Sequence, residues 1–245
     1  MSDKPRDYRC KGLETAKFDW RRDAYYESLP KVIELAGEPQ NLIHHFPAYT
    51  GHVTMARFLA LYEAYKMTMG LSGHIAEAGV FKGTSVIQFA KLMQLFEPES
   101  LSLVFGFDWF QGNKPEGEEA DLVPEGSYFA SYEEVSELVS VQGLDPIVRL
   151  LNMDLSGPEL EAYFEDNDHL HFKIVMLDCG LYEVVKTCLH SFWKRLGVGG
   201  ILILDNFNHE TAPGEVKAIR EMLPSAKIET FPFCAQPSAY IVKQA

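Results

Sequence analysis

The sequence predicts an α/β fold, a doubly wound and mostly parallel sheet with an N-terminal helical lead-in. Short apolar runs alternate with stretches whose apolar residues recur at helical spacing, which is typical of parallel strands joined by crossover helices. One run enters a glycine-containing turn that leads into a helix, and several others end in an acidic residue. The carboxyl ends of such strands share one edge of the sheet, so we expect a ligand site there.

Length and composition indicate one main domain. The chain has 245 residues, of which 47% are hydrophobic and 23% are charged, and this is enough to bury one sizeable core. We assign residues 1–50 to a helical or irregular extension and residues 51–245 to the domain. The extension has many aromatic residues but no long periodic run. Because so many exposed rings are unusual on a monomer, we expect a homo-oligomer.

Charge and cysteine content disfavour several classes of protein. The net charge of −13 and the pI near 5.0 argue against a nucleic-acid partner, because its phosphates would be repelled. The four cysteines form no C-x-x-C pair, so we expect reduced thiols rather than a zinc knuckle or a disulfide framework. The N-terminus lacks an apolar segment and no run is long enough to span a membrane, so we expect a cytoplasmic protein without a membrane partner.

The individual elements follow from hydrophobic spacing. Apolar residues three and four apart predict a helix over 53–69, which ends before Gly70 and Gly73, and the first strand begins at His74. Further strands are expected at 101–108, 147–153, 172–177, 198–204, 226–231 and 239–243, and further helices at 82–98, 132–142 and 215–222. The last two strands are expected to pair antiparallel at the edge of the sheet.

The turn after the first strand is the main candidate for a cofactor site. Gly79 and Gly83 let the backbone pass close to a ligand, and Thr84 and Ser85 begin a helix whose free N–H groups face the same place. Glu77 stands where the first glycine of a dinucleotide fingerprint would be. A carboxylate there would repel a pyrophosphate but would suit an ammonium group, which favours S-adenosylmethionine over NAD. The alternative reading of Glu77 is an ordinary capping acid in a tight turn.

Two further acids end the second and third predicted strands. Asp108 closes the second strand, where a carboxylate can accept hydrogen bonds from both ribose hydroxyls of a nucleotide-type ligand. Asp154 follows the third strand and could reach the adenine amino group. Each acid has an alternative role as a helix N-cap or loop acid.

A possible metal site follows the next two strands. Asp178 ends one strand, and Asp205 and Asn206 end the other, so two carboxylates and an amide oxygen would meet at one edge. Ligands that are all oxygen favour a hard cation, Mg²⁺ before Ca²⁺ or Mn²⁺. The alternative is that Asp178 caps the following helix and that Asp205 and Asn206 form a turn.

A divalent cation next to a methyl donor would have a clear chemical use. It would bind a substrate hydroxyl, lower its pKa and align its oxygen with the methyl group. Asp178 is the first candidate for the base that takes the hydroxyl proton, and His209 is the second because imidazole titrates near neutrality. Residues 109–131 are rich in glycine, proline and acids, and we expect them to form a lid over the substrate.

These motifs together resemble the macrocin O-methyltransferase family, from about residue 48 to the C-terminus. The resemblance rests on Glu77-Ala78-Gly79-Val80-Phe81-Lys82-Gly83-Thr84-Ser85, Gly106-Phe107-Asp108-Trp109-Phe110-Gln111-Gly112, Leu177-Asp178-Cys179-Gly180-Leu181-Tyr182, Gly199-Gly200-Ile201-Leu202-Ile203-Leu204-Asp205-Asn206 and Pro213-Gly214-Glu215. It implies a Rossmann-like S-adenosylmethionine-dependent fold and a metal site at Asp178, Asp205 and Asn206. The family usually has a second acid where Gly180 stands here.

The resemblance also implies an acceptor class. The sequence is most similar to the 3-O-methyltransferases of nucleotide-linked 6-deoxyhexoses, which implies a sugar or nucleotide-sugar acceptor such as dTDP-rhamnose, in natural-product or polysaccharide biosynthesis. One alternative is O-methylation of an already glycosylated or phenolic natural product. A second is a non-catalytic scaffold that binds S-adenosylmethionine, which the missing acid at Gly180 makes conceivable.

Overall fold

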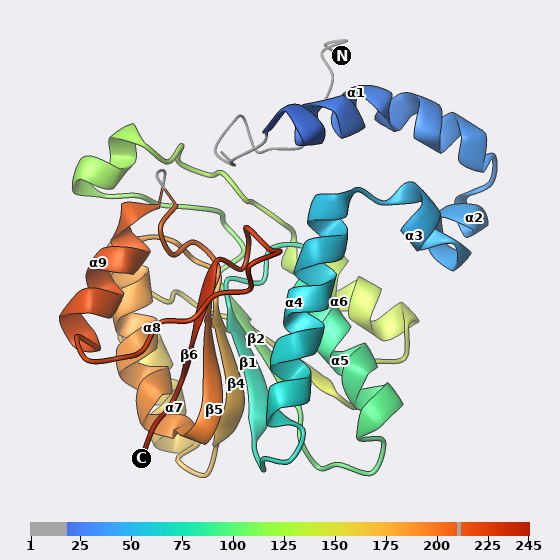
Figure 1. The fold of residues 1–245 in the computed structure, drawn as a ribbon. Helices are drawn as coiled ribbons and strands as arrows, with labels where there is room; N and C mark the ends of the chain where they lie inside the picture. The colour runs from blue at the N-terminus through green and yellow to red at the C-terminus, as the bar shows by residue number, and fades with distance from the viewer. Residues whose placement is uncertain (1–18, 210–211) are drawn as a thin grey trace.

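The computed structural model describes residues 19–209 and 212–245, and their strands form one mostly parallel sheet (Figure 1). The strand order is β3-β2-β1-β4-β5-β6, and β6 alone among them runs antiparallel to its neighbour. This confirms the predicted fold class. The strands are β1 His74–Ala78, β2 Val104–Asp108, β3 Val148–Asn152, β4 Phe172–Leu177, β5 Leu196–Leu204 and β6 Ala239–Val242.

Helices cover both faces of the sheet. On one face lie α4 His52–Thr68, α5 Thr84–Phe96 and α6 Tyr132–Val141, and on the other lie α7 Glu159–Asp166, α8 Tyr182–Arg195 and α9 Pro213–Met222 (Figure 1). The parallel strands end together at the upper end of the sheet in Figure 1. We call this edge the rim and define it by Gly79, Asp108, Asp178 and Asp205, which end or follow β1, β2, β4 and β5.

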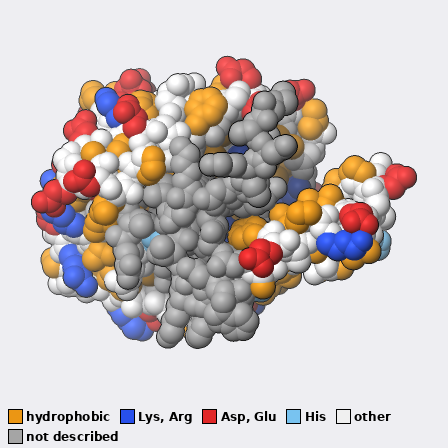
Figure 2. Space-filling view, turned by 90° about the horizontal axis from the view of Figure 1, so that it is seen from above, with side chains coloured by type: hydrophobic (Ala, Val, Ile, Leu, Met, Phe, Trp, Pro, Cys, Tyr) orange, Lys and Arg blue, Asp and Glu red, His pale blue; other side chains and the backbone are white. Residues whose placement is uncertain are grey.

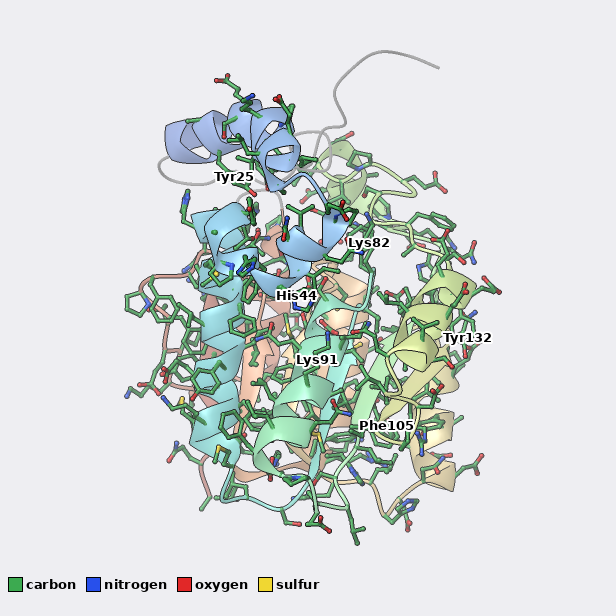
Figure 3. The ribbon with its side chains drawn as sticks, turned by 90° about the vertical axis from the view of Figure 1, so that its right-hand side faces the viewer. Tyr25, His44, Lys82, Lys91, Phe105 and Tyr132 are labelled. Atoms are coloured by element: carbon green, nitrogen blue, oxygen red, sulfur yellow. The ribbon has the colours of Figure 1, made fainter. Side chains whose placement is uncertain are left out.

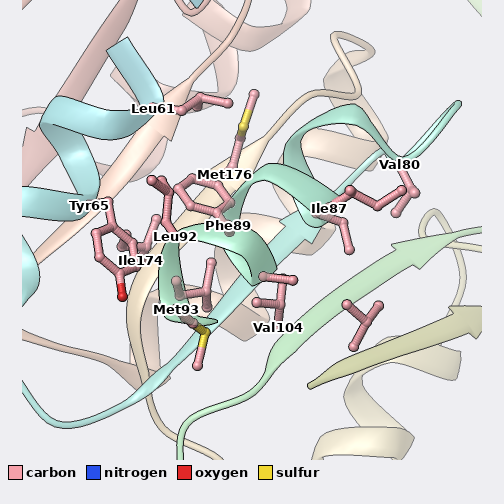
Figure 4. Close-up of a cluster of buried hydrophobic side chains, with 14 of the residues drawn as sticks. Leu61, Tyr65, Val80, Ile87, Phe89, Leu92, Met93, Val104, Ile174 and Met176 are labelled. Carbon is pink, nitrogen blue, oxygen red and sulfur yellow. The ribbon is translucent and has the colours of Figure 1, made fainter. Parts of the chain in front are cut away.

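Each face of the sheet has its own hydrophobic core. On the α4–α5 side, Leu61 and Tyr65 of α4 and Phe89 of α5 pack with Ile174 and Met176 of β4 (Figure 4). The other core contains a set of aromatic rings in mutual contact, with centroids 5.1–5.9 Å apart: Phe107, Phe164, Phe172 and Phe192. Large apolar areas buried on both faces fix the strands, and through them the rim.

A charged pair is buried at the end of β4 that lies opposite the rim. The Lys173 side chain is 1% exposed, and its Nζ lies 2.8 and 2.7 Å from the two carboxylate oxygens of Glu97. Tyr65 donates its hydroxyl to the same carboxylate. The ammonium is thus buried only together with an acid that neutralises it.

The described part of the predicted extension is helical. It consists of α1 Asp19–Ala36, α2 Pro39–His44 and α3 Phe46–Tyr49, and residues 1–18 lie outside the described residues. Tyr25 of α1 lies beyond the rim in Figure 3, and its hydroxyl donates to the Tyr49 carbonyl oxygen at 2.9 Å. The extension projects from the body in Figure 2 and carries exposed hydrophobic side chains: Ile33, Leu35 and Ile43. Among the described helices, none has the length and apolar character needed to cross a bilayer.

One predicted element is wrong. Residues 226–231 form no strand, and the pairing there is a single bridge between Glu229 and Tyr240. The edge of β5 is already occupied by β6, and Pro232 has no N–H group with which to extend a ladder beyond the bridge. The antiparallel edge pairing is therefore between β5 and β6.

Candidate active site

The turn from β1 to α5 passes the backbone close to β4. Gly79 has φ +94°, and a Cβ added there would lie 2.1 Å from the Asp178 carbonyl oxygen. Gly83, at the N-cap of α5, has φ +78°. Both positions need glycine because L side chains rarely adopt these angles, and at Gly79 the space is also missing. Thr84 at the start of α5 is exposed, and Ser85 is buried.

Glu77 lies under this turn, not at its surface. Its side chain is buried, and its Oε2 accepts a hydrogen bond from the Val86 N–H at 3.1 Å. Burial and the neighbouring Asp178 carboxylate raise the pKa of Glu77 well above its ordinary value. The contact with Val86 ties β1 to the first turn of α5, which corresponds to the capping alternative for this residue.

Asp108 holds the same turn from the side of β2. Its Oδ2 accepts from the N–H groups of Val80 and Phe81 at 2.7 and 2.9 Å, and its Oδ1 accepts from the Phe110 N–H at 2.8 Å. The carboxylate therefore stabilises the turn between β1 and α5 and the start of the loop after β2. Asp154 makes a local contact after β3, where its Oδ1 accepts from the N–H and the hydroxyl of Ser156 at 2.8 and 2.7 Å.

Asp178 and Asp205 meet at one side chain, Arg57 of α4. Arg57 Nη2 donates to Asp178 Oδ2 at 2.7 Å, and Nη1 donates to Asp205 Oδ1. Nη2 also lies 3.1 Å from the Ser85 hydroxyl oxygen. Because both carboxylates reach the two arms of one planar guanidinium, they converge on one small region of the rim.

The electrostatics of this region are strongly coupled. Burial by itself would lower the pKa of Arg57, but the carboxylates of Asp205 and Asp178 raise it well above its ordinary value. Burial and the Asp205 carboxylate raise the pKa of Asp178 to about 7. Glu215 at the start of α9 is fully buried, and burial together with Asp205 and Asp178 raises its pKa well above the ordinary value. The rim therefore holds more acid than its contacts neutralise.

Asn206 and His209 follow Asp205 in the chain, and the hydrogen bonds described below join them to residues other than Asp178 and Asp205. The Asn206 side-chain oxygen accepts from Gln236 Nε2 at 3.2 Å, and its backbone N–H donates to Glu215 Oε1 at 3.0 Å. His209 donates its backbone N–H to the Asn206 carbonyl oxygen at 3.0 Å. His209 is one of the residues that line a surface cavity of about 500 Å³, together with Asn208, Pro213, Val216, Lys217 and Arg220.

Two carboxylates at the rim could bind a hard cation, but a third acidic ligand is missing among the described residues. Asp178 and Asp205 point at one position, which a guanidinium fills here, and among the described residues Glu215 Oε2 is buried without a hydrogen-bond partner. Within the described ranges, however, no group of three His, Cys, Asp or Glu residues could hold a metal. A metal at this place would therefore need an amide, water or substrate oxygen in addition to the two carboxylates.

The predicted lid lies over one side of the rim. Within residues 109–131, η1 Gly117–Asp121 is a short 3-10 helix, and Glu119 accepts a bifurcated hydrogen bond from the Tyr182 N–H at 3.1 and 3.2 Å (Figure 1). This contact connects the segment to the first residue of α8. Lys82, in the turn between β1 and α5, lies near the rim in Figure 3.

Sequence reasoning missed two residues of this site. Arg57 lies in α4, a helix that was correctly predicted, one turn before the first of the residues that α4 buries against the sheet. The signal in the sequence was a charged residue on the helix face that packs against the core. Glu215 was predicted only as the first residue of a helix, where an acid is usually exposed and stabilises the dipole. Its complete burial depends on the packing of α9 against α8, which no local pattern reveals.

Comparison with known proteins identifies a matching protein family and similar folds. A family model described as a methyltransferase domain matches residues 76–207, and no curated protein matches the chain. Two solved structures, described as CalS11, a calicheamicin methyltransferase, and apo CalS11, TDP-rhamnose 3′-O-methyltransferase, are both 22% identical to this chain, with TM-scores of 0.80 and 0.72. They cover 98% and 97% of this chain and 99% of their own chains. The O-methyltransferase NovP is 19% identical, with a TM-score of 0.63 over 78% of this chain and 80% of its own. At these identities the likeness is one of fold.

Proposed function

This chain belongs to the methyltransferase domain family, and from that premise we propose that it is an S-adenosylmethionine-dependent O-methyltransferase that uses Mg²⁺ or another hard divalent cation. The acceptor we propose is a sugar hydroxyl, the 3-OH of a nucleotide-linked 6-deoxyhexose such as dTDP-rhamnose. The likeness in fold to a protein described as a TDP-rhamnose 3′-O-methyltransferase supports this acceptor class.

The observation that carries the proposal is the convergence of the Asp178 and Asp205 carboxylates beside the β1–α5 turn. They bind the same guanidinium, and an added Cβ at Gly79 would touch the backbone of Asp178. A cofactor at the turn and an acceptor at the carboxylates would therefore be neighbours. Methyl transfer depends mainly on such alignment, for which effective molarities correspond to roughly 7–11 kcal/mol.

We assign the cofactor to the first three strand ends. The backbone at Gly79 and Gly83 would lie against the methionine portion, with Thr84 and Ser85 at the helix start and Glu77 supplying negative charge beneath it. Two further acids would act on the nucleoside: Asp108 on the ribose hydroxyls and Asp154 on the adenine.

The reaction breaks the bond from the sulfonium sulfur to the methyl carbon, forms a bond from that carbon to the acceptor oxygen, and releases the hydroxyl proton. Asp178, Asp205 and Asn206 are the residues we propose to hold the divalent ion, which would supply a Lewis acid that makes the hydroxyl more acidic. Asp178 is the first candidate to take the proton, and His209 is the second because imidazole titrates near neutrality. The segment 109–131 would exclude water from this place.

The proposal is tested by incubating the purified protein with methyl-labelled S-adenosylmethionine and a panel of acceptors, with Mg²⁺ or with EDTA. We expect transfer to dTDP-rhamnose that EDTA abolishes and added Mg²⁺ restores. Asp178→Asn should reduce turnover strongly, whereas Asp168→Asn, at an exposed acid away from the rim, should not. Turnover on a glycosylated or phenolic compound alone would support the alternative acceptor. Cofactor binding without transfer to any acceptor would support a scaffold protein.

A further inference from the structure

We propose that Arg57 is a built-in counter-cation of the rim that must leave before a divalent ion can bind, so that the arginine side chain and the ion exclude each other. This inference rests on the proposed function, because it concerns the same pair of carboxylates. It adds Arg57, on α4, as a residue that controls whether a divalent ion can occupy the site.

The contacts of Arg57 match those expected of a substitute cation. One arm of its guanidinium binds Asp178 at 2.7 Å, the other binds Asp205, and the first arm also contacts the Ser85 hydroxyl at 3.1 Å. Within the part of the chain that the structure describes, no other Lys or Arg forms an ion pair with either acid. The position between the two carboxylates is therefore filled by Arg57 alone among these residues.

The charges favour replacement of the arginine by an ion of higher charge. Arg57 donates to Asp178 and Asp205, and two further buried acids, Glu77 and Glu215, interact electrostatically with those two carboxylates. The Asp178 and Asp205 carboxylates share the single positive charge of one guanidinium, and among the described residues Glu215 Oε2 has no hydrogen-bond partner. Because Coulomb attraction scales with charge, a divalent ion at the same position would neutralise the group better than a guanidinium.

The arginine can leave without disturbing the acids. The backbone of Asp178 is fixed by its N–H bond to the Ala78 carbonyl oxygen at 2.8 Å, and that of Asp205 by its bond to the Leu177 carbonyl oxygen at 3.1 Å. Arg57 comes from a separate element, α4, and its side chain is 23% exposed. Rotation of this long side chain toward solvent therefore frees the carboxylates while the strands that present them stay in place.

The test compares Mn²⁺ binding to the full-length wild type, Arg57→Ala and Arg57→Gln, by measuring free Mn²⁺ with electron paramagnetic resonance. We expect both variants to bind Mn²⁺ at least tenfold more tightly than the wild type. Arg149→Ala, which removes an exposed arginine on β3, is the matched control and should bind like the wild type. Adding Asp205→Asn to Arg57→Ala should remove the gain, since it deletes one of the two carboxylates.

A second readout uses the wild type and needs no variant. In protein labelled with ¹⁵N-arginine, the Arg57 side-chain N–H signal, assigned by its loss in Arg57→Gln, should shift on saturation with diamagnetic Mg²⁺. Equal Mn²⁺ affinity of wild type and Arg57 variants, with an unshifted signal, would overturn the inference and leave the proposed function standing. If none of the proteins binds a divalent ion while methyl transfer proceeds in EDTA, the metal part of the proposed function is wrong, and the exchange with it.

Discussion

Gly79 and Asp178 lie in such close contact that one methyl group at Gly79 would come within 2.1 Å of the Asp178 carbonyl oxygen. The Asp178 N–H also donates to the carbonyl oxygen of Ala78, the residue before Gly79, at 2.8 Å. The proposed cofactor turn and Asp178 are therefore one structural unit. A change at the turn is transmitted directly to the position of the acid.

Gly79→Ala should damage both stability and cofactor binding. A left-handed non-glycine residue costs about 1–3 kcal/mol, and the collision with backbone adds to this, so we expect a loss of more than ~3 kcal/mol in the free energy of unfolding. Gly83→Ala is the matched comparison, because its Cβ would meet the end of the Val135 side chain at 3.0 Å. Urea unfolding and calorimetry with S-adenosylmethionine measure both effects, and equal losses in the two variants would contradict the argument.

Glu97→Ala should destabilise the fold without any direct effect on the rim. It leaves the Lys173 ammonium buried without its carboxylate, and breaking such a pair costs about 3–5 kcal/mol. Glu63→Ala is the control, since Glu63 pairs with Lys66 at the surface, and it should cost less than about 1 kcal/mol. Chemical denaturation gives both values. A restored stability in Glu97→Ala combined with Lys173→Met would show that the unpaired charge is the cause.

Glu215→Gln should stabilise the protein more at high pH than at low pH. Burial raises the pKa of Glu215 above its ordinary 4.5, so the folded state holds the proton more tightly than the unfolded state. Stability from this group is complete below 4.5 and is lost as the pH rises through the folded pKa. The amide cannot ionise, and its oxygen can still accept from the Asn206 N–H.

The measurement is the melting temperature of Glu215→Gln and wild type from pH 4.5 to pH 8.5 in EDTA. The difference between them should grow with pH. Glu165→Gln, at an exposed acid, should show a constant difference over the same range. A gain that is the same at all pH values would mean that the carboxylate is not the source of the penalty.

Glu119→Gln should loosen the segment 109–131. The Glu119 carboxylate accepts from the Tyr182 N–H at the start of α8, and a neutral amide makes a weaker bond there. We expect a higher KM for the sugar acceptor and an unchanged Kd for S-adenosylmethionine, because the contact lies on the lid side of the rim. Glu118→Gln, one residue away in the same short helix, is the control. An unchanged KM would remove the proposed role of this segment as a lid.

The fold class could be predicted because parallel strands buried on both faces are apolar throughout, and their hydrophobic runs stand out in the sequence. The meeting of Asp178 and Asp205 could also be predicted, since the topology brings the ends of β4 and β5 together. The orientation of a side chain is not part of that argument. The contact of the Asn206 amide oxygen with Gln236, which comes from a loop 30 residues further along the chain, could not be predicted in this way.

The face of α4 shows why sequence reasoning missed Arg57. The apolar residues three and four apart that predict this helix include Leu61 and Tyr65, which are buried, but also Phe58 and Leu59, which are 36% and 43% exposed. The buried stripe also contains two small residues, Ala60 and Ala64, that let the helix approach the sheet, and Thr68. Arg57 continues this stripe to the rim. A search for apolar spacing selects large hydrophobic residues, whereas close packing of a helix on a sheet requires small ones. On α4 the close packing determines which face is buried.

The direction of β6 has a practical consequence for experiments on this enzyme. Because β6 runs antiparallel to β5, the chain reaches Ala245 at the pole of the molecule opposite the rim (Figure 1). Lys243 anchors this end by donating to the carbonyl oxygens of Trp193 and Leu196 at 2.7 and 2.8 Å. A fluorophore or surface-immobilisation tag fused after Ala245 thus leaves the rim unobstructed.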